Sequence, residues 1–307
     1  MKRAPRIHAA LLAAIAMGSQ LAGCAGSLAP GYTAANKPLF VAVGDGVVLT
    51  SPDTVTWSAH ALPSSNTPFD AYRNDNRYWV LGQAGSMYTS TDGVSWVSLS
   101  TQSNDTLLRM TRAPNGTFVA VGMGGTIVSS TTGLTWQARQ SGGSDLQDVI
   151  ATNGGFLAVG KSGSILQGSS SAAAWTPVSS GTTTHLNGIA QLGNRYIVSG
   201  REGTILTSTD GTDWSAAESG TSSTLWGVAA SNKQAVIVGS GGTILTSSDG
   251  QTWTARQSGV TTSLIGVSWS GTKFIAVGYN GVVLTSTDGT TWTEQVTGGN
   301  WPLFRVF

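Results

Sequence analysis

Short alternating runs of hydrophobic and polar residues repeat along the chain with a period near forty residues. A tryptophan closes each repeat, and successive tryptophans are 39 or 40 residues apart. They are Trp57, Trp96, Trp136, Trp175, Trp214, Trp253 and Trp292. A repeat of this length predicts a radial or stacked architecture built from one small supersecondary unit.

Each repeat contains four short strand patterns, which we call A to D in chain order. In the sixth repeat they are residues 225–230, 235–238, 243–247 and 252–256, with an Asp-Gly hairpin signal before the last. Four short strands in about forty residues are typical of a propeller blade. Seven repeats therefore predict an all-β protein, a seven-bladed β-propeller with four-stranded blades.

The first repeat lacks strand A, and the end of the chain has a spare one. Residues 302–307 align with residues 264–269, which are strand A of the seventh repeat. We expect this C-terminal strand to complete the first blade, because closure of the ring removes free strand edges. Strand B is apolar on both faces in most repeats, as in residues 118–121, and packing between neighbouring blades would cover both.

Composition supports the all-β prediction and excludes one class of partner. The chain has 41 glycines and only 10% charged residues, which is typical of many tight turns and few helices. The formal net charge is +1. A charge this small is not that of a nucleic-acid-binding surface, so we expect no nucleic acid partner.

The N-terminus has a basic start, a short apolar stretch and then Leu21-Ala22-Gly23-Cys24. This segment resembles a bacterial lipoprotein signal with its lipobox, which implies cleavage before Cys24 and acylation of that residue. The implied organisation is a signal peptide (1–23), a lipidated tether (24–37) and the propeller (38–307). The alternative is an ordinary secretory signal with an incidental cysteine.

The lipoprotein resemblance also implies an address in the cell. The protein would be held in the bacterial cell envelope through its lipid anchor, either periplasmic or surface-facing. Ala25 follows the cysteine, where aspartate would favour the inner membrane, so the outer membrane is the expected site.

The turn between strands C and D carries the motif Ser-Thr-Asp-Gly-x-x-Trp or a close variant. Its aspartates are Asp53, Asp92, Asp210, Asp249 and Asp288. The motif is similar to the Asp box of BNR/sialidase-type propellers, within the wider group of WD40/YVTN-like repeats. With the preceding Gly-Thr-Ile-Leu-Thr-Ser, residues ~38–307 resemble the photosystem II assembly/stability factor family. The resemblance implies the fold and a role in binding membrane-protein clients.

We interpret these aspartates as structural, because an Asp side chain commonly accepts backbone N–H groups of its own turn. One per blade lies too far from the next to share a calcium ion, which needs six to eight oxygens. The spacing of histidine and cysteine also fits no metal site. We therefore expect no metal and no cofactor.

Four charged residues occupy equivalent positions in strand A: Asp70, Arg109, Asp148 and Arg305. We expect them near the central channel and interpret them as mutually neutralising. A sialidase-like or other glycoside hydrolase would instead show two acids and an arginine cluster converging on the central pocket. A scaffold would show a broad mixed patch without a strongly shifted acid.

Binding is predicted at the face formed by the D–A and B–C connections. This face is opposite the C–D turns, which carry the aspartates. The candidate residues are Lys161, Arg201, Glu202, Tyr279, Asn280, Trp226 and Trp301. Exposed aromatic and arginine side chains are typical anchors of interfaces. Phe69 and Phe304 begin strand A beside this face, and for Trp226 and Phe304 an inter-blade core position is the alternative.

The sequence therefore favours a non-catalytic envelope lipoprotein whose propeller face recognises a protein, in an assembly, scaffold or adhesion role. The expected partner is an envelope protein or complex. The alternative is a glycan-active propeller, either a sialidase-like hydrolase or a lectin-like binder, and a structural spacer without a ligand is the third hypothesis.

Overall fold

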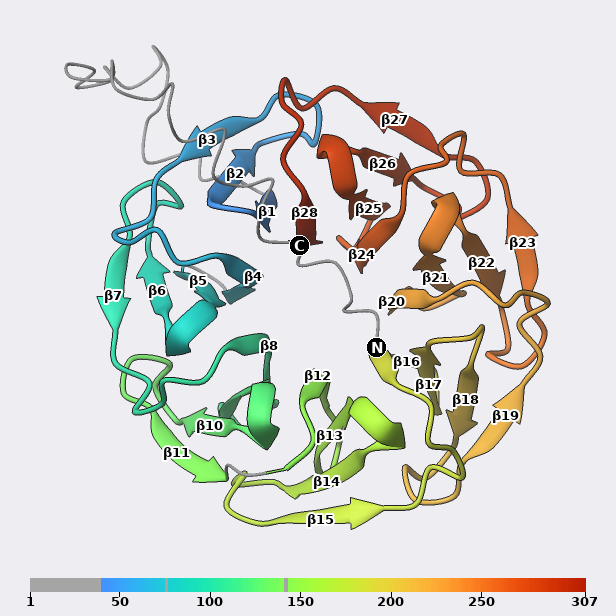
Figure 1. The fold of residues 1–307 in the computed structure, drawn as a ribbon, viewed down its shortest axis with the longest axis horizontal. Coiled ribbons are helices and arrows are strands. Elements are labelled where there is room, and N and C mark those ends of the chain that lie inside the picture. The colour runs from blue at the N-terminus through green and yellow to red at the C-terminus, as the bar shows by residue number, and fades with distance from the viewer. Residues whose placement is uncertain (1–39, 75–76, 141–142) are drawn as a thin grey trace, which may run out of the picture. The chain divides into compact units, whose positions relative to one another are not determined.

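The computed structural model describes residues 40–74, 77–140 and 143–307, and these form seven four-stranded antiparallel sheets. The sheets are arranged as blades around a central axis (Figure 1). Strands β4, β8, β12, β16, β20, β24 and β28 face the axis (Figure 1). The predicted fold class, a seven-bladed propeller, is confirmed.

The strands of each blade run from the axis outward. They are, in blade 1, β28 (Leu303–Val306), β1 (Phe40–Gly44), β2 (Val47–Ser51) and β3 (Ser58–His60); in blade 2, β4 (Pro68–Asn74), β5 (Arg77–Gly82), β6 (Met87–Ser90) and β7 (Val97–Leu99); in blade 3, β8 (Leu107–Arg112), β9 (Phe118–Gly122), β10 (Ile127–Ser130) and β11 (Gln137–Gln140); in blade 4, β12 (Leu146–Ala151), β13 (Gly155–Gly160), β14 (Ile165–Ser169) and β15 (Trp175–Val178); in blade 5, β16 (Leu186–Leu192), β17 (Arg195–Gly200), β18 (Ile205–Ser208) and β19 (Ser215–Ala217); in blade 6, β20 (Leu225–Ala230), β21 (Ala235–Gly239), β22 (Ile244–Ser247) and β23 (Thr254–Arg256); and in blade 7, β24 (Leu264–Trp269), β25 (Phe274–Gly278), β26 (Val283–Ser286) and β27 (Thr293–Gln295).

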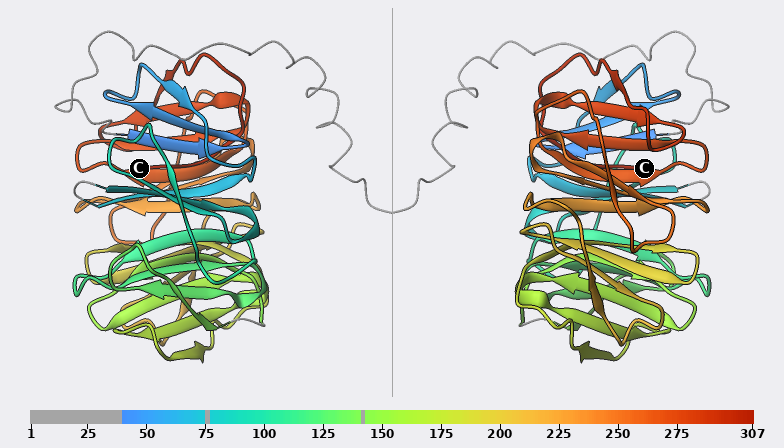
Figure 2. Two further views of the ribbon diagram at one scale, coloured as in Figure 1. Left: turned by 90° about the vertical axis from the view of Figure 1, so that its left-hand side faces the viewer. Right: turned by 90° about the vertical axis from the view of Figure 1, so that its right-hand side faces the viewer.

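Short 3-10 turns follow the second strand in five of the blades. They are η2 (Gln83–Gly85), η3 (Met123–Gly125), η4 (Lys161–Gly163), η5 (Ser240–Gly242) and η6 (Tyr279–Gly281). The connections between strands gather at the two ends of the ring (Figure 2).

The hydrophobic core is divided into seven clusters, each formed between two neighbouring blades. The cluster between blades 7 and 1, for example, joins Ile275 and Val283 to Ala42 and Leu49. The repeat tryptophan of each blade packs into the cluster shared with the preceding blade, as Trp57 does here. The second strand of each blade is therefore covered on both faces, which explains its apolar sequence.

The C-terminal strand closes the ring. Strand β28 pairs antiparallel with β1, with Val306 opposite Ala42 and Leu303 opposite Gly44. The amide of Phe307 donates to the carbonyl of Val41 at 3.1 Å. Leu303 and Val306 are fully buried between blades 7 and 1. The prediction that residues 302–307 complete the first blade is confirmed.

The aspartates of the C–D turns accept hydrogen bonds from their own turns. In blade 5, Oδ1 of Asp210 accepts the amides of Thr212 and Asp213, both at 2.8 Å, and the hydroxyl of Ser208 at 2.9 Å. Asp53, Asp92, Asp249 and Asp288 repeat this pattern. The amide donors hold the pKa of the Asp210 carboxyl below its usual range. These contacts stabilise the turns.

The repeats without the aspartate replace it differently. In blade 3 the hydroxyl of Thr132 accepts the amides of Leu134 and Thr135 at 3.2 and 3.3 Å. In blade 4 the amide of Ala172 donates to the carbonyl of Ser169, and the amide of Ala174 donates to the hydroxyl of the same serine. No group of three or more His, Cys, Asp or Glu side chains that could hold a metal ion occurs in the described part of the chain.

Candidate functional site

The B–C turns and D–A connections lie together at one end of the ring, which we call the loop-rich face. Their backbones are joined by hydrogen bonds in several blades. The amide of Lys161 donates to Asp145, and that of Arg201 donates to His185, both at 2.9 Å. The C–D turns that carry the aspartates lie at the opposite end of the same sheets.

The candidate binding residues are spread over this face. Arg201 and Glu202 are exposed on the turn of blade 5, and Tyr279 and Asn280 are exposed on η6 of blade 7. The Lys161 ammonium forms an ion pair with Asp145. Trp301 is half-buried and packs against the cluster between blades 7 and 1, whereas Trp226 lies near the axis.

Each inner strand carries a β-bulge at the same place, next to the loop-rich face. In β8, Leu107 is opposite Gly122 and Arg109 is opposite Val121, so Leu108 has no partner of its own. The unpaired residues of the seven blades are Phe304, Phe69, Leu108, Gln147, Asn187, Trp226 and Ile265. A bulge re-aims one side chain away from the regular alternation of the strand.

All seven bulged residues line one cavity of about 240 Å³ on the axis. Arg109 and Met123 complete its lining. Since Met123 belongs to η3, a B–C turn, the cavity lies at the loop-rich face.

Several contacts fix the walls of the cavity. The rings of Phe69 and Phe304 lie 5.5 Å apart. The indole N–H of Trp226 donates to Oγ of Ser240 at 3.0 Å, and the side-chain amide of Asn187 donates to the carbonyl of Leu225 at 2.9 Å. These contacts orient the side chains before a ligand binds, which lowers the entropy cost of binding.

The residue after each bulge forms a second ring within the propeller, which we call the charge ring. Its members, from blade 1 to blade 7, are Arg305, Asp70, Arg109, Asp148, Gly188, Gly227 and Gly266. Arg305 Nε lies 3.5 Å from Asp70 Oδ1, and Arg109 Nε lies 4.0 Å from Asp148 Oδ1. Charges thus alternate over four blades, and glycines occupy the other three.

The aspartates of the charge ring are buried and its arginines are partly buried, and this burial shifts pKa values. Asp70 is 2% exposed, and desolvation raises the pKa of its carboxyl to about 6 against the opposing effects of Arg109 and Arg305. Desolvation likewise lowers the pKa of Arg109. The guanidinium Nη1 of Arg109 also donates to the carbonyls of Phe69 and Leu108, at 3.2 and 2.8 Å.

The charge ring shows part of the pattern expected for a glycoside hydrolase, two acids and two arginines, and the raised pKa of Asp70 departs from the expectation for a scaffold. Oδ2 of Asp70 accepts the amide of Met110 at 2.8 Å, and Oδ2 of Asp148 accepts the amide of Ile189 at 3.0 Å. Each carboxylate thereby joins its own blade to the next, and neither is among the residues that line the cavity. Their arrangement is that of mutually neutralising structural charges.

The glycines of the charge ring allow the inner strands of blades 5, 6, 7 and 1 to approach closely. A Cβ atom at Gly266 would lie 2.5 Å from the carbonyl oxygen of Phe304. The ring is therefore joined by ion pairs and amide–carboxylate bonds on one side, and by close backbone packing on the other.

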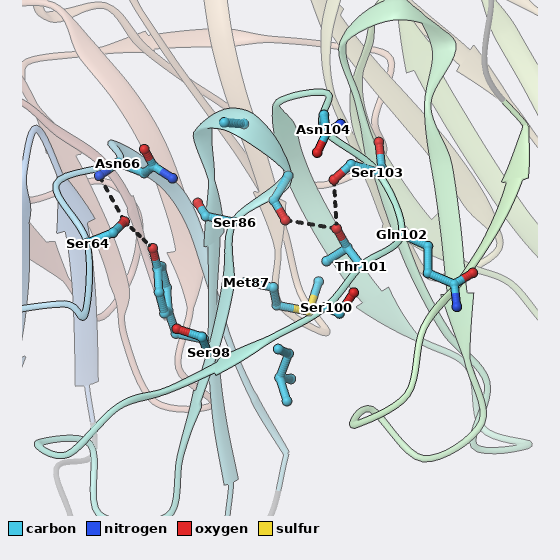
Figure 3. A pocket seen from close by; sticks show the side chains of 14 residues that line it. Ser64, Asn66, Ser86, Met87, Ser98, Ser100, Thr101, Gln102, Ser103 and Asn104 are labelled. Atoms are coloured by element: carbon cyan, nitrogen blue, oxygen red, sulfur yellow. Dashed lines mark hydrogen bonds between the residues drawn. The ribbon is translucent and has the colours of Figure 1, made fainter.

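A polar groove of about 520 Å³ beside blade 2 is another hollow of the loop-rich face (Figure 3). Ser64, Asn66, Ser98, Gln102 and Asn104 line it (Figure 3). Similar grooves of about 640 and 450 Å³ occur at the same place in blades 4 and 7. Because this hollow recurs with the repeat, it belongs to the scaffold. The axial cavity receives one side chain from every blade and is the candidate site.

Part of this cavity was predictable from the sequence. It placed Phe69, Trp226 and Phe304 beside the loop-rich face, but it missed Leu108, Gln147, Asn187 and Ile265. All four could have been found from their position in the repeat, because each directly follows the buried first residue of its inner strand.

The fold and the cavity define the class of protein: a seven-bladed β-propeller with a hollow on its axis. Residues 32–146 match the DUF6242 beta propeller domain family. A search of curated protein sequences finds no match.

Solved structures with a similar fold include two of YCF48. YCF48 bound to a D1 peptide has a TM-score of 0.62 at 18% identity, over 76% of this chain and 82% of that chain. YCF48 from Cyanidioschyzon merolae has a TM-score of 0.62 at 16% identity, over 79% and 95%. The computationally designed Ika8 protein has a TM-score of 0.62 at 13% identity, over 86% and 88%. At these identities the similarity shows the fold alone.

Proposed function

We propose that this protein is a non-catalytic propeller that binds a protein partner at its loop-rich face, with the axial cavity as the anchor site. The observation that carries the proposal is that seven bulged side chains, one from each blade, line a single cavity. Five of them are apolar or aromatic: Phe69, Leu108, Trp226, Ile265 and Phe304. Desolvated pockets of this kind typically hold the anchor residues of an interface.

Two further observations support a protein partner. The cavity is smaller than the about 300–1,000 Å³ of typical small-molecule sites, so a ligand larger than one side chain must extend over the surrounding face. Tyr279, Arg201 and Glu202 are exposed there and offer the mixed aromatic and polar contacts of an interface rim. YCF48, which has a similar fold, has been solved bound to a peptide.

Replacement of Trp226 by alanine should abolish partner capture in an in-cell cross-linking experiment. Removing a central aromatic anchor typically costs about 2 kcal/mol or more, which is about a 30-fold loss of affinity. Arg201→Ala/Tyr279→Ala should weaken capture less, because rim contacts contribute less than the centre. The readout is the amount of the most abundant cross-linked envelope protein, measured by mass spectrometry.

The matched control is Leu134→Ala, because Leu134 is 42% exposed on a C–D turn at the opposite face. It should capture the partner as the unmodified protein does. Equal recovery of the same proteins by all four forms would contradict recognition at the loop-rich face. Glycan binding and hydrolysis assays would then test the alternative function.

We also propose that the propeller is lipid-anchored in a bacterial cell envelope through Cys24. This residue and the segments 1–23 and 24–37 lie outside the described residues, so the proposal rests on the sequence around the Leu21-Ala22-Gly23-Cys24 motif. No helix within the described residues is long and apolar enough to span a membrane. The expected location is the outer membrane, with the propeller periplasmic or surface-facing.

Replacement of Cys24 by serine should abolish labelling with an alkyne-tagged fatty acid and release the protein from the membrane fraction. Several acyl chains contribute about 0.8 kcal/mol per buried methylene group, so their loss should change the distribution almost completely. The control Ala25→Asp should keep the label and move the protein toward the inner membrane. A Cys24→Ser protein that still takes up the fatty-acid label would contradict the lipid anchor.

A further inference from the structure

The walls of the axial cavity are chemically divided. Going around the ring, blades 6, 7, 1, 2 and 3 present the apolar and aromatic residues. Blades 4 and 5 present the carboxamides of Gln147 and Asn187. An occupant must therefore combine a largely apolar body with one hydrogen-bonding edge.

The polar side of the cavity has hydrogen-bonding capacity that the described residues do not use. The Asn187 amide group donates to Leu225, which leaves its Oδ1 as an acceptor. The Gln147 side chain has no hydrogen-bond partner among the described residues and is half-buried. A ligand that covered this half-buried amide without offering a hydrogen-bonding group would leave it without a partner, so a ligand that supplies both a donor and an acceptor here gains affinity.

The charged side chain in the cavity wall disfavours one class of anchor. Arg109 lines the cavity, whereas its counter-charges Asp70 and Asp148 do not. A lysine or arginine anchor would meet this guanidinium without a carboxylate among the lining residues to pair with. An oxygen acceptor is favoured in its place.

The volume limits the size of the occupant. The cavity has a volume of about 240 Å³, below the about 300–1,000 Å³ typical of small-molecule sites. This is room for one aromatic side chain and little more. The rings of Trp226, Phe69 and Phe304 provide flat or edge contacts of the kind that aromatic pairs prefer.

From these features we propose that the cavity receives the side chain of a tyrosine from the protein partner. Its ring lies against Trp226 and the pair Phe69–Phe304, and its hydroxyl lies toward Gln147 and Arg109. The hydroxyl donates to the Gln147 carbonyl and accepts from an N–H group of the same polar side. A phenylalanine would fill the cavity but leave Gln147 without a partner. This inference rests on the proposed function, because it names the anchor of that same interface.

The test compares two probes, p-cresol and toluene, which are the side-chain analogues of tyrosine and phenylalanine. The full chain carrying Cys24→Ser serves as the protein, so that no detergent competes for the probes. Binding is followed by heteronuclear NMR at the indole N–H of Trp226, a resonance assigned by its loss in Trp226→Phe. We expect p-cresol to bind about two- to tenfold more tightly than toluene, the range expected for one net hydrogen bond.

The variant Gln147→Leu should remove this preference, and toluene should then bind at least as tightly as p-cresol. The matched control is Gln191→Leu, because Gln191 is an exposed glutamine of β16, outside the cavity, and should retain the preference. Equal binding of the two probes to the unmodified cavity, or no change at the Trp226 resonance with either, overturns the inference.

A second measurement separates this inference from the proposed function. A photo-cross-linking amino acid at Met123, on the rim of the cavity, should label a partner peptide that contains a tyrosine. Capture of a partner that is insensitive to Tyr→Phe substitution in that peptide overturns the tyrosine anchor and leaves the proposed function standing. If p-cresol is preferred but no partner is captured, the proposed function fails. The inference that the tyrosine comes from a protein partner then fails with it.

Discussion

Removal of residues 302–307 is expected to unfold the propeller at room temperature. The deletion removes β28, and with it Leu303 and Val306, both fully buried between blades 7 and 1. Loss of one buried leucine side chain alone costs about 2–5 kcal/mol. This is a large part of the about 5–15 kcal/mol that stabilises a native domain. Urea unfolding and the near-ultraviolet circular dichroism of the tryptophans measure the effect.

Two further losses add to this cost. The deletion exposes the edge of β1, where the amide of Asp45 loses its bond to Pro302 and that of Val41 its bond to Phe307. It also removes Arg305, the ion-pair partner of Asp70, and leaves Arg109 to offset the charge of that buried carboxylate. Removing one partner of a buried ion pair is strongly destabilising.

A circular permutant controls for the identity of the missing residues. Because β28 and β1 are antiparallel neighbours, residues 300–307 can precede residue 40 through a short Gly/Ser linker. The permutant restores blade 1 as a continuous sheet and should fold cooperatively. A truncated protein that keeps the native tryptophan spectrum would contradict the role of β28 in closure.

The fold could be predicted because its determinants recur locally in each repeat. The tryptophan spacing, the apolar second strand and the Asp-Gly turn each appear several times, so a deviation in one unit does not obscure the pattern. Ring closure followed from one alignment, that of residues 302–307 with strand A of the seventh repeat. The four charged residues of the charge ring were found in the same way, from equivalent positions in strand A.

The cavity could be predicted only in part, because its geometry depends on the bulges. Regular alternation along β8 would orient Leu107 and Arg109 alike and Leu108 to the opposite face. The bulge interrupts this alternation, so Leu108 and Arg109 both line the cavity. The residue type at the bulge differs from blade to blade, so only its position after the first residue of the inner strand, compared across repeats, marks it. For the same reason, the sequence predicted Trp226 and Trp301 as members of one binding face. In the structure Trp226 lines the cavity, whereas Trp301 packs between blades 7 and 1.

Replacement of Arg109 by methionine is expected to destabilise the protein by about 3–5 kcal/mol at pH 8, the cost typical of removing one partner of a buried ion pair. The substitution leaves Asp148 without its ion-pair partner and removes one of the two guanidiniums that lower the pKa of Asp70. The loss should be smaller at pH 5. Urea unfolding at pH 5, 6.5 and 8 measures it.

The direction of this pH dependence follows from the raised pKa of Asp70. In the native protein its pKa is about 6, above the ordinary value of 3.8, so the folded state binds the proton more tightly than the unfolded state. The stabilising effect of that proton is complete below about pH 4 and is lost as the pH rises through 6. Without Arg109 the pKa of Asp70 in the folded protein rises further. The loss of stability then extends to higher pH, and the cost of the substitution is largest where Asp70 is ionised.

The matched control is Arg201→Met, which makes the same change of side chain at an exposed turn. It should change the free energy of unfolding by no more than about 0.5 kcal/mol at any of the three pH values. The double variant Arg109→Met/Asp148→Asn should recover part of the stability at pH 8. It removes the carboxylate that has lost its ion-pair partner and keeps one side-chain oxygen to accept a backbone amide. An equal loss for Arg109→Met at pH 5 and pH 8 would mean that packing of the long side chain, rather than charge balance within the ring, accounts for its effect.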